Sequence, residues 1–273
     1  MALYIASLNS GSNGNCYYIG NGDEAILVDA GLSCMETEKR MRQLELSMRS
    51  VKAIFISHEH TDHVKGLSTL ANKYKLPIYI TSPTAANGMR MIRHLSVPFQ
   101  AGVLVQIGGL SITPFTKQHD AVDPHSFIIS GNGVTVGVFT DIGTACTQVS
   151  RHFKACHAVF LEANYDDDML EKGNYPVYLK NRIRSDVGHL SNAQALELFE
   201  KHRPDFMTHV LLSHLSKDNN DPQLVKELFM SRANGVSIVI ASRYEASPVY
   251  TIHGNGGDGN AAIKVGKQMK LFI

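Results

Sequence analysis

The sequence predicts an α/β fold of four layers, αββα, in which two mixed β-sheets face each other and helices cover their outer sides. The first observation is that the two halves of the chain look alike, because each has β-rich segments followed by strand–loop–helix units. The second is the pattern of turns, such as Asn21-Gly22-Asp23 and Gly131-Asn132-Gly133, that separate short apolar strands. Two facing sheets with outer helices would use all of these elements.

Strands and helices alternate in the first half of the chain. Apolar or alternating runs predict strands at 3–7, 15–20, 24–31, 53–57 and 77–80. Helices are expected at about 35–46, at about 62–75 and within 83–95. The second of these helices rests on Val64, Leu67, Leu70 and Ala71, which recur at helical spacing.

The second half begins with more β-rich sequence. Strands are expected at 102–107, 110–117, 125–130, 134–140, 157–163, 206–213 and 236–241. A helix over 192–202 follows Ser191, with Gln194 in place for a capping box. Another helix begins at Asp221-Pro222 and is ended by Asn234-Gly235, whereas the segment after 163 is a polar stretch.

Composition limits the kind of protein this is. Of 273 residues, 44% are hydrophobic and 19% are charged, as in an ordinary globular protein with a sizeable core. We expect one domain, 1–273, with its core at about 3–241 and with edge strands or a tail at 246–273. The formal net charge of +1 excludes a global basic field, so nucleic acid would need a local patch.

The four cysteines are scattered without C-x-x-C spacing, which argues against a zinc ribbon and against a disulfide scaffold. Neither a signal peptide nor a long apolar run is visible. We therefore expect a cytoplasmic protein that does not enter the membrane.

The segment His58-Glu59-His60-Thr61-Asp62-His63 carries the clearest chemical information. It lies between an expected buried strand and a helix, where a turning backbone can aim alternate side chains at one point. Imidazole binds Zn²⁺ and other transition metals, and a carboxylate suits harder divalent ions. The segment predicts a metal site, and a solvated polar turn with accidental histidines is the alternative.

With this segment the chain resembles the metallo-β-lactamase superfamily over about residues 3–241, and the resemblance implies the sandwich fold of that superfamily. The remaining ligand positions match in the expected order, although alone His119 or His214 would more often be an ordinary buried histidine. The resemblance implies one metal on His58, His60 and His119, a second on Asp62, His63 and His214, and Asp141 as the bridge. Asp29 matches the structural aspartate behind the metal loop. Two Zn²⁺ ions are expected, with Mn²⁺ or Fe²⁺ as alternatives.

Two further segments narrow the chemistry. Glu162 in LEANY and His189 in GHLSN are similar to segments of the tRNA 3′-processing endonucleases of this superfamily. The resemblance implies that His189 is a general acid, that Glu162 orients it, and that Asp62 orients a metal-bound hydroxide. Phosphodiester cleavage releases an alkoxide, which a protonated imidazole beside a carboxylate can neutralise. Alternatively, His189 merely begins a helix and Glu162 forms a surface ion pair.

Several motifs together resemble the YycJ/WalJ group of the superfamily, some of whose members are implicated as 5′→3′ exonucleases on double-stranded DNA. These motifs are SGSNGN, HDAVDPHSF, TDIG, LEANYD, GHLSN and LSHLSKDNN. The chain departs from the tRNA-processing enzymes, because Leu-Ser-Asn follows His189 where they have Ser-Thr, and because it has no long Gly/Pro-rich arm.

Local charge offers candidate substrate contacts. Lys180, Arg182 and Arg184 lead into His189 and lie near Tyr175 and Tyr178, a mixture that can track phosphates and stack bases. A solvated loop without a partner is the alternative. The backbone N–H groups of the 10–15 turn could cradle a phosphate, or the turn could simply join two strands.

These observations predict a dinuclear metal-dependent phosphodiesterase acting on nucleic acid, with DNA as the expected substrate. Hydrolysis of a small ester, such as a cyclic phosphodiester, a thioester or a lactone, is the first alternative, and the near-neutral charge favours it. A non-catalytic regulatory protein with this fold is the second alternative, and the complete ligand set opposes it.

Overall fold

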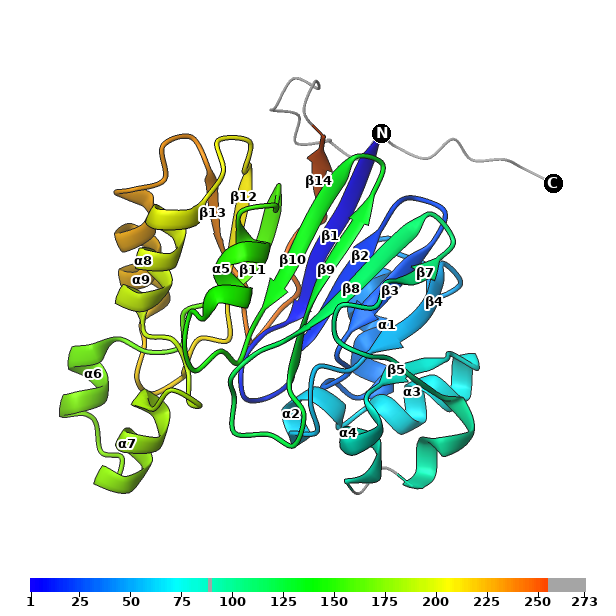
Figure 1. The fold of residues 1–273 in the computed structure, drawn as a ribbon, viewed down its shortest axis with the longest axis horizontal. Coiled ribbons are helices and arrows are strands. Elements are labelled where there is room, and N and C mark those ends of the chain that lie inside the picture. Colours follow the sequence, from blue (N-terminus) through cyan, green and yellow to red (C-terminus); the bar gives the residue numbers. More distant parts are fainter. Residues whose placement is uncertain (88–89, 255–273) are drawn as a thin grey trace.

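The computed structural model describes residues 1–87 and 90–254, which form two seven-stranded sheets with helices outside them (Figure 1). The first sheet has the order β14-β1-β2-β3-β4-β5-β6 and contains β1 (Ala2–Asn9), β2 (Cys16–Gly20), β3 (Ala25–Val28), β4 (Val51–Phe55), β5 (Ile78–Ile80), β6 (Ser96–Pro98) and β14 (Tyr250–His253). The second has the order β13-β12-β11-β10-β9-β8-β7 and contains β7 (Val105–Ile107), β8 (Leu110–Thr116), β9 (His125–Gly131), β10 (Val134–Phe139), β11 (Ala158–Glu162), β12 (His209–Ser213) and β13 (Ser237–Ile240).

Both sheets are mixed. Strands β3 to β6 are parallel, as are β10 to β13, and the remaining pairings are antiparallel. The helical segments are α1 (Cys34–Gln43), α2 (Thr61–Val64), α3 (Leu67–Tyr74), α4 (Ser82–Ala86), the 3₁₀ helix η1 (Arg90–Leu95), α5 (Thr147–Phe153), α6 (Asp167–Lys172), α7 (Val177–Arg184), α8 (Asn192–His202) and α9 (Pro222–Met230).

Three apolar clusters hold the layers together. The central cluster joins the two sheets, as where the ring of Tyr17 on β2 lies 4.8 Å from that of Phe160 on β11. A second packs α5, α8 and α9 on the outer face of one sheet, and a third packs α1 and α3 on the outer face of the other (Figure 1). The αββα prediction is therefore confirmed.

Several predicted boundaries are wrong for identifiable reasons. The helix expected over about 62–75 is divided into α2 and α3, because the Gly66 N–H donates to the Ala30 carbonyl at 2.9 Å and not to the preceding turn. Gly66 also lies so close to Leu32 that an added Cβ would be 1.7 Å from the Leu32 carbonyl oxygen. The segment within 83–95 likewise forms α4 and then η1.

Other elements are shorter than expected or were not predicted. Of the strand expected at 102–107, only β7 forms, and the helix expected at about 35–46 is α1, which begins after its cap Ser33. The polar stretch after 163 contains α6 and α7, and α5 lies before β11. The short polar helices α6 and α7 have no apolar periodicity to reveal them, and α7 has no buried residue.

The predicted caps and the end of the chain can also be placed. The capping box of Ser191 and Gln194 is present, and Asp221 accepts from two backbone N–H groups at the start of α9. Strand β14 lies within 246–273 and pairs with β1 at the sheet edge, where Ile252 is fully buried. Residues 255–273 are outside the described part. No helix in 1–87 or 90–254 is both long and apolar enough to cross a membrane.

Arg40 on α1 ties the end of β1 to the segment after β13. Its guanidinium is buried and donates to the Leu8 carbonyl at 2.6 Å, to Asn9 Oδ1 at 2.5 Å and to the Tyr244 carbonyl at 2.9 Å. Its Nε also donates to Glu36 at 2.9 Å. These bonds fix the end of β1, which leads into the 10–15 loop, and the segment around Tyr244, which packs beside that loop.

Arg40→Ala is expected to lower the free energy of unfolding by about 3 kcal/mol, because it leaves buried acceptors without a donor. Exposed Arg42 on the same helix provides the control, and Arg42→Ala should change the unfolding free energy by less than about 0.5 kcal/mol. Equilibrium denaturant unfolding of both variants measures the difference. Equal losses would contradict this account of Arg40.

Candidate metal centre

Three of the predicted ligands follow the carboxyl ends of strands that belong to the two sheets. Strand β4 leads into His58, β10 into Asp141 and β12 into His214, and the parallel partners within each sheet end at the same edge. Side chains from distant parts of the sequence can therefore meet there, as they do at the strand ends of other parallel sheets.

Three residues at these strand ends have left-handed backbone conformations. Asp29, Asp141 and His214 have φ angles of 62°, 54° and 55°. This region costs a residue with a side chain about 1–2 kcal/mol, so the rest of the fold must enforce it. The backbone turns abruptly at each of these strand ends, so the side chain of the residue points toward the other predicted site residues and not along the sheet.

The structure brings all seven predicted ligands together. One group of ligand atoms comprises His58, His60 and His119, and a second comprises Asp62, His63 and His214; within each group the atoms lie within 4.8 Å of one another. Asp141 lies between them, because its Oδ2 is 3.3 Å from His63 Nε2 in the second group and its Oδ1 is 3.9 Å from His119 Nε2 in the first. These are two of four overlapping groups of possible ligand atoms among the described residues, and the division that the resemblance implies stays a prediction.

Burial and neighbouring carboxylates shift the pKa values of the predicted histidine ligands in opposite directions. Burial lowers the pKa of His58 well below its ordinary value and that of His119 to about 4, so both rings are neutral and can offer a lone pair to a metal. Burial also opposes protonation of His214, but Asp141, Asp62 and Glu162 raise its pKa to about 10. A dication bound here would replace positive charge that the proton on His214 otherwise supplies.

Two orphaned atoms show that the donor set fits a metal. Nε2 of His58 and Oδ2 of Asp141 are buried without a hydrogen-bond partner among the described residues. Oδ2 is near His63 Nε2, but the two atoms are not aligned for a hydrogen bond. Unpaired buried polar atoms are costly, and coordination would satisfy both. The mixture of imidazole and carboxylate suits Zn²⁺ and other divalent transition metals alike.

Asp29 holds the 57–63 segment, which contains four of the predicted ligands, through hydrogen bonds. Its carboxylate accepts from Ser57 N at 2.8 Å, from Ser57 Oγ at 2.9 Å and from His63 Nδ1 at 2.7 Å. Because Nδ1 of His63 is the donor here, Nε2 is left to face the centre. Such contacts fix the orientation and tautomer of a metal-binding histidine.

Three polar residues that the sequence did not single out also support the centre. Asn15 Nδ2 lies 3.1 Å from Asp62 Oδ2, and Asn164 Nδ2 donates to the His214 carbonyl at 2.8 Å. Buried Lys117 donates to the Thr140 carbonyl at 2.7 Å, next to Asp141. Asn15 and Asn164 lie within motifs that the sequence did reveal, SGSNGN and LEANYD, but nothing in those motifs indicates which side chain points inward.

Glu162 and His189 form a pair beside the predicted ligands. Nδ1 of His189 donates to Glu162 Oε1 at 2.8 Å and lies 3.9 Å from Asp141. Glu162 is fully buried, whereas the His189 side chain is 21% exposed, so its Nε2 can meet a ligand from solvent.

Several donors keep Glu162 ionised. Burial alone would raise its pKa, but His189 and a contact of 3.2 Å from His214 Nδ1 lower it to about 2. The backbone N–H of Ile142 also donates to Oε2 at 2.7 Å. The His189 imidazole therefore has an anionic partner throughout the neutral pH range.

The predicted substrate contacts lie on α7, but most of their charge is neutralised. Arg182 forms an ion pair with Asp120, the residue after His119, and Arg184 forms one with Glu171. Lys180 donates to the Glu171 carbonyl. Figure 1 shows α6 and α7 projecting beyond the sheets at the end of the molecule where α2 lies.

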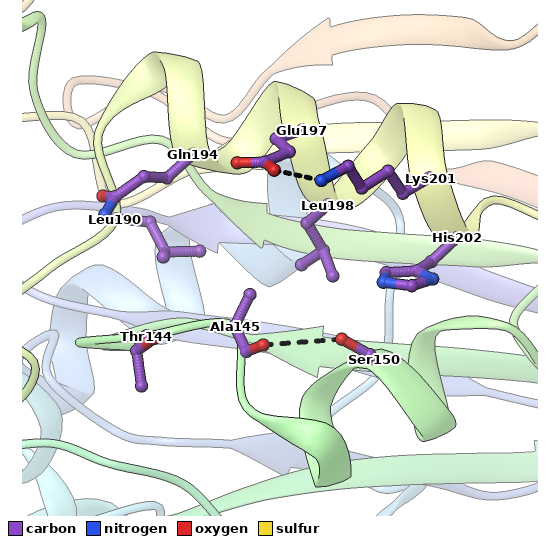
Figure 2. A pocket seen from close by; sticks show the side chains of 9 residues that line it. All are labelled: Thr144, Ala145, Ser150, Leu190, Gln194, Glu197, Leu198, Lys201 and His202. Carbon is purple, nitrogen blue, oxygen red and sulfur yellow. Dashed lines mark hydrogen bonds and ion pairs between the residues drawn. The ribbon is translucent and has the colours of Figure 1, made fainter.

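A separate cavity of about 290 Å³ lies between α8 and the 144–150 segment (Figure 2). It contains none of the predicted ligands, and a Glu197–Lys201 ion pair lies on its α8 side. One lining residue of the cavity, Leu190, directly follows His189 in the sequence. The concentration of reactive groups is therefore at the strand ends and not in this cavity.

Comparison with known proteins agrees with the fold. A model of the β-lactamase superfamily domain matches residues 24–214. Exodeoxyribonuclease YycJ of Bacillus anthracis is 36% identical over 230 residues, covering 83% of this chain and 87% of the relative. Exodeoxyribonuclease WalJ of Streptococcus pneumoniae is 32% identical over 230 residues, covering 81% and 83%.

A solved structure gives the same fold at low sequence identity. The metallo-β-lactamase fold protein YhfI of Bacillus subtilis superposes with a TM-score of 0.70 at 16% identity, covering 92% of this chain and all of that protein. Together with the domain match and the two relatives, this shows that the chain belongs to the metallo-β-lactamase superfamily, in the group of YycJ and WalJ, and is a metal-dependent hydrolase.

Proposed function

We propose that the chain is a dinuclear metal-dependent nuclease, with 5′→3′ degradation of double-stranded DNA as its activity and the cytoplasm as its location. The observation that carries the proposal is the Glu162–His189 pair, in which His189 Nδ1 lies 3.9 Å from Asp141. A proton donor at that place is useful for a leaving group that departs as an alkoxide. Both curated relatives are named exodeoxyribonucleases, which supports the same reading.

The metals would be held by the seven residues already described, one by His58, His60 and His119, the other by Asp62, His63 and His214, with Asp141 between them. Two divalent ions at such a centre polarise a phosphoryl oxygen and activate water at neutral pH. Zn²⁺ fits the nitrogen-rich donor set, and Mn²⁺ or Fe²⁺ fits it as well.

The side chains around the centre divide the proton transfers. Asp62, 21% exposed and held by Asn15, accepts a hydrogen bond from the attacking water and orients it toward phosphorus. The ionised Glu162 stabilises a protonated His189 and fixes its ring through Nδ1. The Nε2–H of His189 then donates its proton to the departing 3′ oxygen.

Helix α7 would contribute to substrate binding through Lys180, Arg182 and Arg184. Arg182 is linked to the centre through its partner Asp120, whose Oδ1 lies 3.4 Å from His119 Nε2. A phosphate binding there would compete with Asp120, so this contact would be weaker than one made by an unpaired arginine.

Hydrolysis of a small ester is the second candidate, and the net charge of +1 and the ion-paired arginines of α7 favour it. A substrate panel separates the two. Purified protein with Mn²⁺ or Zn²⁺ is expected to cleave 5′-phosphorylated duplex DNA and bis-p-nitrophenyl phosphate, but not a glutathione thioester. Cleavage of the thioester without cleavage of duplex DNA or structured RNA would overturn the nuclease proposal.

His189→Ala is expected to lower kcat on duplex DNA by about 10²–10⁴, because the 3′ oxygen then leaves without a proton donor. The loss on bis-p-nitrophenyl phosphate should be far smaller, since p-nitrophenolate leaves without protonation. His202→Ala, at the far end of α8, is the matched control. Elemental analysis should find the same metal content in all three proteins, and metal lost with His189 would mean that this residue is a ligand.

Glu162→Gln is expected to lower kcat on duplex DNA more than on bis-p-nitrophenyl phosphate, because the neutral amide no longer provides the anionic oxygen that holds His189 Nδ1. Glu162, with a pKa of about 2, is ionised at neutral pH, so the substitution removes a charge there. Steady-state kinetics on the two substrates measure the difference. An equal loss on both substrates would show that Glu162 acts only by holding Ile142 and Leu190.

A further inference from the structure

Arg243 lies beside the metal centre on the side of His214, in the segment that follows β13. Its Nη2 donates to the Leu215 carbonyl at 2.9 Å and lies 3.4 Å from Ser12 Oγ. Leu215 directly follows His214, one of the predicted ligands. The sequence alone does not single out Arg243, because it lies outside every motif.

The 10–15 loop places the guanidinium. Gly11 has a φ of 127°, and an added Cβ there would lie only 2.8 Å from Nη2 of Arg243. Asn13 donates to the Arg243 carbonyl at 2.8 Å, and Ser10 Oγ accepts from the His214 N–H at 2.7 Å. The same loop ends at Asn15, which contacts Asp62. One short loop therefore connects Arg243 to two predicted ligands.

Arg243 differs from the arginines of α7 in its charge balance. Among the described residues, no carboxylate lies within 4.0 Å of its guanidinium, and no hydrogen bond uses its Nε or Nη1. Arg182 and Arg184, by contrast, are paired with Asp120 and Glu171. A half-buried, uncompensated guanidinium with free donors is suited to binding an anion with two oxygens in one plane.

We propose that Arg243, together with the Ser12 hydroxyl, binds a backbone phosphate next to the one that is cleaved, on the His214 side of the centre. This inference rests on the proposed nuclease function and names a substrate contact for it. Phosphate contacts of this kind set the position of a nucleic-acid strand without reading its sequence. Arg243 is thus a positioning residue that holds the strand while the scissile phosphate lies on the metals.

The test compares Arg243→Gln and Arg243→Lys with Arg203→Gln. Arg203 is the matched control, because its guanidinium also donates to backbone carbonyls, those of Arg232 and Ala233, and it lies at the opposite end of α8 from Ser191. Arg243→Gln is expected to raise KM for duplex DNA roughly tenfold with little change in kcat. The loss in kcat/KM should be about tenfold larger on the duplex than on bis-p-nitrophenyl phosphate, which has no neighbouring phosphate.

Salt dependence separates charge from structure. Duplex binding is measured by anisotropy in the His189→Ala background, in which cleavage is slowed, and in a time short compared with the residual turnover. Arg243→Gln should reduce the slope of log Kd against log salt by about one, because one fewer phosphate is neutralised, and Arg243→Lys should restore it. An unchanged slope and KM in a protein whose wild type cleaves DNA would overturn the inference alone. A wild type that cleaves no nucleic acid would overturn the proposed function, and the inference with it.

Discussion

The carboxylate of Asp141 is the constraint on which the centre depends. It is almost fully buried, and a buried anion is stable only with positive charge or hydrogen-bond donors around it. His63, His214 and Lys117 provide that charge, and they lower the pKa of Asp141 well below its ordinary value against the effect of burial. One of its oxygens still has no hydrogen-bond partner among the described residues. A metal ion on each side would take over the positive charge that the protons on His63 and His214 otherwise supply.

The sheets make this concentration of charge possible. Parallel strands end at a common edge, and left-handed backbone at three of these ends turns Asp141 and His214 inward and Asp29 toward His63. The strain is offset by hydrogen bonds that hold each turn, such as those from Ser57 to Asp29 and from Asn164 to His214. The centre is therefore pre-organised by backbone conformation and not only by the choice of side chains.

Much of this could be predicted, because the HEHTDH segment is contiguous and a buried strand precedes it. The αββα layers could be predicted from the alternation of apolar strand and helix segments. Those segments form the two sheets and the three apolar clusters. Asn164 and Arg243 could not be predicted, since their roles arise from contacts between segments distant in sequence. The break at Gly66 depends on a contact with Ala30 and Leu32, which helical periodicity cannot show.

The position of the metal ions decides the role of His189. Asp141, Glu162, His189 and His214 also lie close enough together to hold an ion, so the assignment of His189 as a proton donor depends on metal being elsewhere. Anomalous diffraction from crystals grown with Mn²⁺ would locate the ions directly. Two peaks are predicted, one at His58, His60 and His119 and one at Asp62, His63 and His214, both in contact with Asp141. A peak on His189 and Glu162 would contradict the account.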